Sequence, residues 1–323
     1  RNNNTDTPLP PEIPAGQNPP DGAMLDYWLP SPSPTPVVLE ISDASGKLVR
    51  RFSSDDKPSA PPEIELNVSM HWIRPEGVPV ASAGMHRFVW DLHYPPPDAI
   101  ERDYPISAII HDTPLYPLGP AVLPGDYTVK LIVGGKSYSR PLTIKMDPRV
   151  KTSPDDLRAQ FEAETRIADA MQRDFRALQQ AQSLRARLQE VGKTAGPKAP
   201  VQLKSVDDKA AIIEGTLGGY GSEYLSTPAG RGLARLNSGF NSLLAVVQSA
   251  DAAPTTQALA MFAELEKALE EQLAKWQELQ TQDLPVLNKA LKQAKLAAIA
   301  LPGPDSKESP APGPMRSHHE DLE

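Results

Sequence analysis

The uneven distribution of proline constrains this chain more than any other feature of its sequence. Of the 36 prolines, 25 lie in residues 1–150, 6 in residues 151–300 and 5 in the short remainder. Proline fixes φ and lacks a backbone donor, so helix interiors and central strands exclude it. The first half must therefore be built of loops and short strands, whereas the second half is free to be helical. We predict a change of architecture near residue 150.

Apolar and polar residues alternate in several short runs between residues 23 and 148. Such alternation predicts strands with one buried face. About six or seven short antiparallel strands at this spacing are typical of an immunoglobulin-like β-sandwich, which we predict for residues 23–148. The predicted strands are 23–28, 36–41, 47–52, 86–92 and a hairpin over 121–149 that turns at Gly134-Gly135. Their predicted inward residues are Val37, Leu39, Ile41, Leu48, Phe52, Phe88, Trp90, Leu92, Tyr127, Val129, Leu131 and Val133.

The segments between these runs read as loops. Asp43–Gly46 is a predicted turn, because Gly46 accepts a positive φ. Residues 53–83 and 94–119 are long proline-broken excursions. Residues 1–22 are polar and proline-rich, so we expect an extended linker there.

Beyond residue 149 the apolar period changes from two to about 3.6, which predicts helices. Ser153-Pro154 is a helix start with a capping serine, and Gly192 is the predicted stop. Pro285 should kink or split the last helix. We predict an antiparallel four-helix bundle over 149–300 and a disordered tail over 301–323. The predicted helices are 153–191, 206–217, 228–249 and one from Thr255 or Thr256, with Leu157, Phe161, Ala168, Met171, Phe175, Leu178, Leu233, Leu236, Phe240, Leu243, Val247, Leu259, Phe262, Leu269, Leu273, Trp276, Leu287 and Leu291 inside.

Composition excludes several functions. The formal charge of -8, with a pI near 5.4, argues against a nucleic-acid partner, because phosphate binding depends on clustered Lys and Arg. No apolar run approaches the roughly 20 residues that cross a bilayer. With no cysteine, the chain forms no disulfide and no zinc–thiolate site.

The sequence predicts no catalytic, cofactor or metal site. It lacks the nucleophile, zinc, phosphate and calcium motifs. His86 and His93 flank the Trp90 strand and point to opposite faces, so we interpret them as ordinary surface or loop histidines. The run His318–Asp321 lies in the expected disordered tail, where it lacks a fixed geometry for a metal.

Three weaker patterns provide alternatives. The acidic loop with Asp98, Glu101, Asp103 and Asp112 contains the residue type of glycoside hydrolases, but nothing in it fixes two carboxylates across a cleft. Asn67-Val68-Ser69 fits a glycosylation sequon. Trp28, Trp72 and Trp90 are candidates for a sugar-stacking platform, although Trp90 is expected in the core, as is Trp276 in the helices.

A series of short motifs in a fixed order resembles a known family. The series is Gly16–Ala23 with Tyr27, Val38–Ile41 to Gly46, Gly84 to Phe88–Leu92, Pro124–Tyr127 and Asp147–Arg149. It resembles the C-terminal region of large secreted bacterial proteins built on BNR-repeat, sortilin-like β-propellers, which are labelled glycosyl hydrolase or sialidase-like. The resemblance covers about residues 16–150 well and the helices more loosely, and the sandwich part is also similar to the immunoglobulin-like module of flagellar hook-capping proteins.

The resemblance implies a bacterial, exported protein, secreted or held in the periplasm or cell envelope, whose propeller lies upstream of Arg1. It implies a non-catalytic accessory region that supports the propeller or docks a partner, and it places the family's site residues on the propeller. Two alternatives remain: a part of a propeller glycoside hydrolase whose active site lies mainly upstream, and a helical adaptor that binds a protein partner through the bundle.

Overall fold

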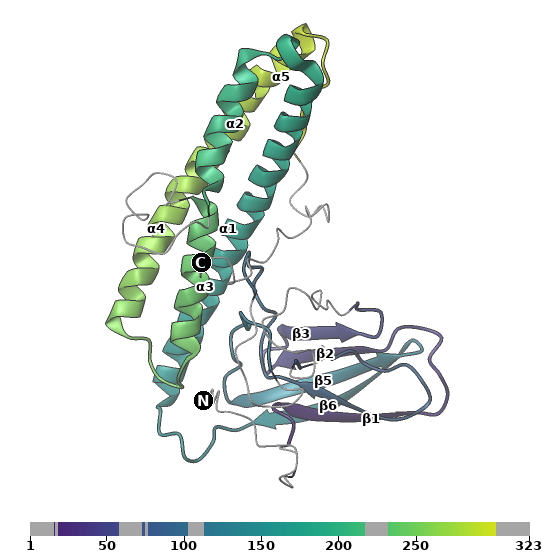
Figure 1. Ribbon diagram of the computed structural model, residues 1–323. Coiled ribbons are helices and arrows are strands. Elements are labelled where there is room, and N and C mark those ends of the chain that lie inside the picture. The colour runs from purple at the N-terminus through teal and green to yellow at the C-terminus, as the bar shows by residue number, and fades with distance from the viewer. Residues whose placement is uncertain are drawn as a thin grey trace, which may run out of the picture.

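The computed structural model describes residues 16, 19–57, 73–74, 77–102, 113–216 and 232–301. Within these residues, antiparallel sheets precede a helical region, which confirms the predicted α+β order. In Figure 1 the sheets lie beside the lower part of the helices, and the upper part of the helical region extends past them. The strands are β1 (Ala23–Leu29), β2 (Val38–Asp43), β3 (Leu48–Ser53), β4 (Gly84–Trp90), β5 (Gly125–Val133) and β6 (Lys136–Ile144). The helices are α1 (Pro154–Ala195), α2 (Val201–Glu214), α3 (Leu233–Gln248), α4 (Thr256–Glu278) and α5 (Leu284–Gln293).

The strands form two antiparallel sheets, one of two strands in the order β1-β4 and one of four in the order β3-β2-β5-β6. Buried residues from both sheets make a single hydrophobic cluster, with Trp90 of β4 and Ile41 of β2 fully buried. The predicted inward set Val37, Leu39 and Ile41 is buried throughout. The alternation in the sequence therefore identified the core face of β2 correctly.

Local chemistry fixes the turns between paired strands. The Asp43 carboxylate accepts hydrogen bonds from the backbone amides of Ser45 and Lys47, and Gly46 has φ 86°. Gly134 and Gly135 both have positive φ, at 56° and 74°, which glycine adopts without a steric penalty. Both predicted turns are confirmed.

One inward prediction in the sheets is wrong. Leu48, at the start of β3, is 49% exposed, whereas its neighbour Val49 is buried. The pairing of β2 with β3 shifts between Ile41 and Ser42, so the faces of β3 do not follow a regular alternation from its first residue. Phe52, further along the strand, packs against the core as predicted.

The helices lie along α1 in an arrangement that differs from a simple up-and-down bundle. Arg185 of α1 pairs with Asp207 and Glu214 of α2, while Gln160 of α1 donates to the carbonyl of Val247 in α3. Helices α2 and α3 thus run antiparallel to successive parts of α1. The helical region therefore has three parallel columns: α1, then α2 with α3, and α4 with α5 (Figure 1).

The ends of α1 show which stop signals work. Ser153 accepts a hydrogen bond from the Asp156 amide and caps the helix, with Pro154 in the first turn, as predicted. The stop at Gly192 is wrong: α1 continues to Ala195, and Gly196 ends it with φ 52°. Gly192 is tolerated inside the helix, where a Cβ would lie 3.5 Å from Leu203.

Pro285 changes the last helix where expected. Helix α4 ends at Glu278, a π-helical segment η6 covers Leu279–Asp283, and α5 starts at Leu284 with the proline in its first turn. The π-helical turn of η6 is wider than an α-helical turn, so the helix tolerates the absence of a backbone N–H at Pro285. Leu259, a predicted core residue of α4, is 45% exposed and that prediction is wrong. Most of the predicted linker and almost the whole predicted tail lie outside the described residues.

Candidate functional site

Two loop segments of the sheet region lie against the helices, and we call this contact the junction. The first follows β4 and the second precedes β5. The Tyr94 ring is 5.5 Å from the Phe161 ring of α1, and Ala99 is buried in the hydrophobic core of the helices. The two segments also contact each other, because a Cβ on Gly119 would lie 2.0 Å from the Tyr94 carbonyl oxygen. Glycine is required at that close approach.

Buried polar side chains of α1 and α3 bind the backbone of these loops. The Glu164 carboxylate accepts from the Ala121 amide at 2.9 Å, and the Gln248 amide donates to the Gly119 carbonyl at 3.0 Å. Both side chains are nearly inaccessible to solvent. Each hydrogen bond is formed away from water, so losing either partner would leave a buried polar group unsatisfied.

The acidic loop contributes to the junction. The Gln172 side chain of α1 both accepts from the Asp98 amide and donates to the Asp98 carboxylate, the latter at 2.8 Å. The Glu101 carboxylate accepts from the Ser238 hydroxyl of α3 at 2.9 Å. The two carboxylates thus bind helix side chains. Asp103 and Asp112, the other members of the predicted loop, lie outside the described residues.

A carboxyl group without a partner lies in the core of the helices. Asp174 of α1 is 0% exposed, and neither of its oxygens has a hydrogen-bond partner among the described residues. Burial raises the pKa of Asp174 to about 8, and the nearby Asn237 side chain opposes only part of that rise. A carboxyl group in this environment stays protonated at neutral pH.

The buried polar residues were missed at the level of sequence, although a signal for them exists. Gln160, Glu164 and Asp174 occupy positions of a stripe that is otherwise apolar, with spacings of four and three. Polar residues at such positions point into a helical core. The stripe is Gln160, Glu164, Ile167, Met171, Asp174 and Leu178.

The two histidines of the described ranges, His86 and His93, contact different backbone carbonyls. The His86 ring lies 2.7 Å from the Ser82 carbonyl, and the His93 ring lies 2.6 Å from the Asp91 carbonyl. Across the described ranges, no group of three His, Cys, Asp or Glu residues is arranged to hold a metal ion. The run His318–Asp321 is outside those ranges.

The tryptophans separate into core and surface. Trp90 is 0% exposed and Trp276 is 4% exposed, as predicted. Trp28 is 64% exposed on the outward side of β1, directly opposite Met85 of β4. Trp72 and the sequon at Asn67 lie outside the described residues. The three predicted platform residues therefore do not share one surface, because Trp90 is in the core.

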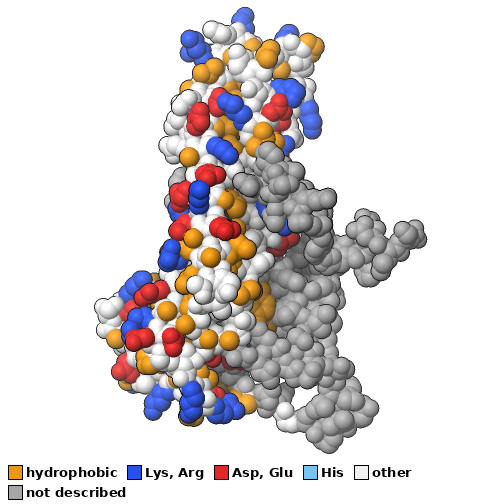
Figure 2. Space-filling model, turned by 90° about the vertical axis from the view of Figure 1, so that its left-hand side faces the viewer, with side chains coloured by type: hydrophobic (Ala, Val, Ile, Leu, Met, Phe, Trp, Pro, Cys, Tyr) orange, Lys and Arg blue, Asp and Glu red, His pale blue; other side chains and the backbone are white. Residues whose placement is uncertain are grey.

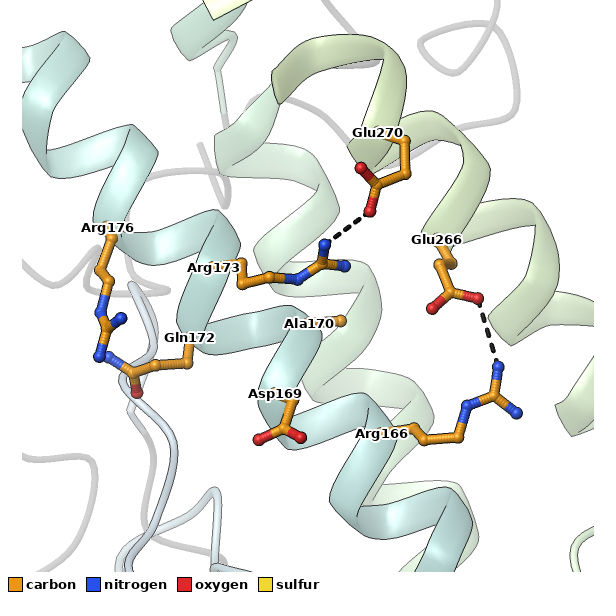
Figure 3. Close-up of a pocket in the computed structure, with 8 residues that line it drawn as sticks. All are labelled: Arg166, Asp169, Ala170, Gln172, Arg173, Arg176, Glu266 and Glu270. Atoms are coloured by element: carbon orange, nitrogen blue, oxygen red, sulfur yellow. Dashed lines mark hydrogen bonds and ion pairs between the residues drawn. The ribbon is translucent and has the colours of Figure 1, made fainter. Parts of the chain in front are cut away.

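A groove of about 550 Å³ runs between α1 and α4. Figure 3 shows Arg173 facing Glu270 and Arg166 facing Glu266 across it, at 2.6 and 3.3 Å, while Arg176 points away from α4. Figure 2 shows basic and acidic side chains interspersed along the helices. Because these pairs are exposed to solvent, each contributes little to stability.

The chain matches no protein-family model, no curated protein and no solved structure. None of the helices in the described part of the chain combines the length and the apolar character that a membrane span requires.

Proposed function

We propose that this chain is a non-catalytic accessory region of an exported β-propeller protein. Its role is to support the propeller or to dock a partner. The observation that carries the proposal is the outward side of the ribbon formed by β1 and β4. We call it the ribbon face. It consists of Met24, Asp26, Trp28, Met85, Arg87 and Val89.

The ribbon face has the composition of a protein interface. Met24, Trp28 and Met85 are 50%, 64% and 71% exposed. Tryptophan, methionine and arginine are enriched in protein interfaces, and lysine is depleted. The ribbon face contains no lysine, and its two charges neutralise each other, because Arg87 binds the Asp26 carboxylate through two hydrogen bonds of 2.8 Å. Exposed apolar residues thus lie on both sides of a neutralised ion pair, an arrangement that supports an interaction site at the ribbon face.

We also propose that the two sheets form an immunoglobulin-like sandwich, which two details of the core support. The Tyr127 hydroxyl donates to the Leu123 carbonyl, four residues upstream, at 2.7 Å. The Trp90 ring packs edge-on against the Tyr127 ring, with 6.0 Å between centroids. A buried tryptophan and a tyrosine that bonds to its own preceding loop are both features of immunoglobulin-like sandwiches.

The junction supports a role in spacing. The helices hold the loops of the sheets through buried hydrogen bonds, such as those of Glu164 and Gln248. A partner bound at the ribbon face is therefore held in a fixed relation to the helices.

The test uses the polypeptide that precedes Arg1 in the parent protein, where we expect repeated propeller blades. That part is produced separately and titrated with this chain by calorimetry. We expect Trp28→Ala to weaken binding at least about tenfold, because tryptophan is enriched among the interface hot spots, whose removal costs roughly 2 kcal/mol or more.

The control is Tyr138→Ala, which removes another aromatic residue, 51% exposed, from β6. It should leave the affinity unchanged. An upstream sequence without propeller blades, or binding that survives Trp28→Ala, contradicts the proposal.

A further inference from the structure

Asp174 and Asn237 form a buried polar pair with unused hydrogen-bonding capacity. The two side chains lie on α1 and α3 and are 0% and 1% exposed. Among the described residues, neither Asp174 oxygen nor the Asn237 Nδ2 has a hydrogen-bond partner. A charged carboxylate at this position would lose its hydration without replacement.

Asn237 connects this pair to a loop of the sheet region. Its Oδ1 accepts from the Ile100 amide at 2.9 Å. We call residues 98–101 the strap. Its other side-chain contacts to the helices, through Asp98 and Glu101, are exposed to solvent and contribute less. The hydrogen bond from the Ile100 amide to Asn237 therefore connects the strap directly to the buried pair.

The charged groups around Asp174 do not compensate it. Within the described ranges, no charged side chain is among the causes that shift the pKa of Asp174, and burial is what raises it. The strap brings two further carboxylates, and Glu266 and Glu270 of α4 are bound to arginines of α1. The charged groups on the elements that pack beside this part of α1 include Asp98 and Glu101 on the strap, Arg235, which is the single charged residue of α3, and the pairs Arg166–Glu266 and Arg173–Glu270 between α1 and α4.

We propose that protonated Asp174 locks the strap onto the helices, and that the strap opens more often once this carboxyl group has released its proton to solvent. The carboxylate requires donors, which water or the Asn237 amide supplies. Water reaches the pair when the element with the weakest attachment moves. We assign this movement to the strap, because its attachment to the helices consists of one hydrogen bond to the buried Asn237, solvent-exposed contacts of Asp98 and Glu101, and the small buried side chain of Ala99.

The pH range follows from linkage. With the strap open, Asp174 is hydrated and its pKa is about 3.9. With the strap closed, its pKa is about 8. The open state then binds fewer protons between these values, so the opening constant rises about tenfold per pH unit from about pH 4 to about pH 8 and is constant above. The strap is held most tightly at acidic pH.

The experiment is hydrogen exchange of the Ile100 amide in the whole chain between pH 5 and pH 9, corrected for intrinsic exchange. We expect the protection of Ile100 to fall about tenfold per pH unit up to about pH 8 and then to level off. The Asp174→Asn variant should show a constant protection. The Val122 amide, which donates to the Leu92 carbonyl at 2.9 Å, is the internal control and should not follow Ile100.

Three results overturn the proposal: constant protection of Ile100 in the natural chain, the same decline in Asp174→Asn, or a parallel decline of Val122, which indicates opening of the whole molecule. If Asp174→Asn does not fold, carbon-detected titration of Asp174 in the natural chain replaces it. A midpoint near 8 is expected, and a midpoint near 4 refutes the lock.

Discussion

At the scale of single residues, Tyr127 links the loop before β5 to the core of the sheets. Its ring is 8% exposed, and its hydroxyl donates to the Leu123 carbonyl at 2.7 Å. We predict that Tyr127→Phe lowers the free energy of unfolding by about 1–2 kcal/mol, because the carbonyl loses its partner. Urea denaturation measures the loss. The control Tyr138→Phe affects an exposed ring and should change nothing.

The Tyr127→Phe variant should also differ from the natural chain in how its stability depends on pH in alkaline solution. Burial raises the pKa of Tyr127 to about 12, whereas an unfolded tyrosine titrates near 10. The folded state thus keeps a proton that the unfolded state loses, so the Tyr127 contribution to stability is lost as pH rises from about 10 to about 12. Tyr127→Phe should unfold with a shallower pH dependence in that range. Equal slopes for both proteins would show that Tyr127 is not shielded from solvent.

From the sequence, Leu48 and Leu259 are assigned to the wrong face, and Gln160 and Asp174 are missed. Leu48 and Leu259 are apolar yet exposed, whereas Gln160 and Asp174 are polar yet buried. The spacing of apolar residues predicts which side of an element is buried only where the element is regular and its neighbours are known. This spacing does not predict the pairing shift near Leu48 or the loops that cover α1.

At the scale of elements, α2 and α3 form one rod because their ends are in contact. A Cβ on Gly232, the residue before α3, would lie 2.4 Å from the Gly215 Cα at the end of α2. We predict that Gly232→Ala costs about 1–3 kcal/mol of folding free energy, because backbone must move. Thermal unfolding followed by circular dichroism measures it.

Gly239→Ala is the matched control within α3. Its new Cβ would lie 3.1 Å from the Leu265 side chain, which can rotate. Alanine also has a helix propensity higher than glycine by about 1 kcal/mol, so the change should be nearly neutral or stabilising. Equal losses at both glycines would show that α2 and α3 do not depend on this close approach.

Element boundaries followed from the sequence where one residue decides them. Ser153 accepts a hydrogen bond from an amide in the first turn of α1, as predicted, and Thr255, one of the two predicted starts, does the same for α4. Glycine is a weaker signal: Gly196 ends α1 because it takes a positive φ, while Gly192 remains helical. The sequence alone does not distinguish two glycines four residues apart, because tertiary contacts decide which one leaves the helix.

At the scale of the whole molecule, the change in proline content predicted the order of sheets and helices. It did not predict the junction. Gln248 and Gly119 are 129 residues apart in sequence, and no local pattern pairs them. Such a contact follows from the packed arrangement of α1, α3 and the loops, which periodicity does not specify.

The junction leads to a prediction for the whole chain, namely that sheets and helices unfold together. In a Trp276→Phe background the remaining tryptophans all precede α1, so their fluorescence reports on the first half, while far-ultraviolet circular dichroism reports mainly on the helices. We expect coincident urea transitions.

Adding Gln248→Ala leaves the Gly119 carbonyl without its buried partner. The free energy of unfolding should fall by about 1–3 kcal/mol, and both transitions should move together to lower urea concentrations. Gln172→Ala, which removes the solvent-exposed contact to Asp98, should have a much smaller effect. A shift in circular dichroism alone would mean that the two halves are separate folding units, and that the buried hydrogen bonds of the junction do not couple them.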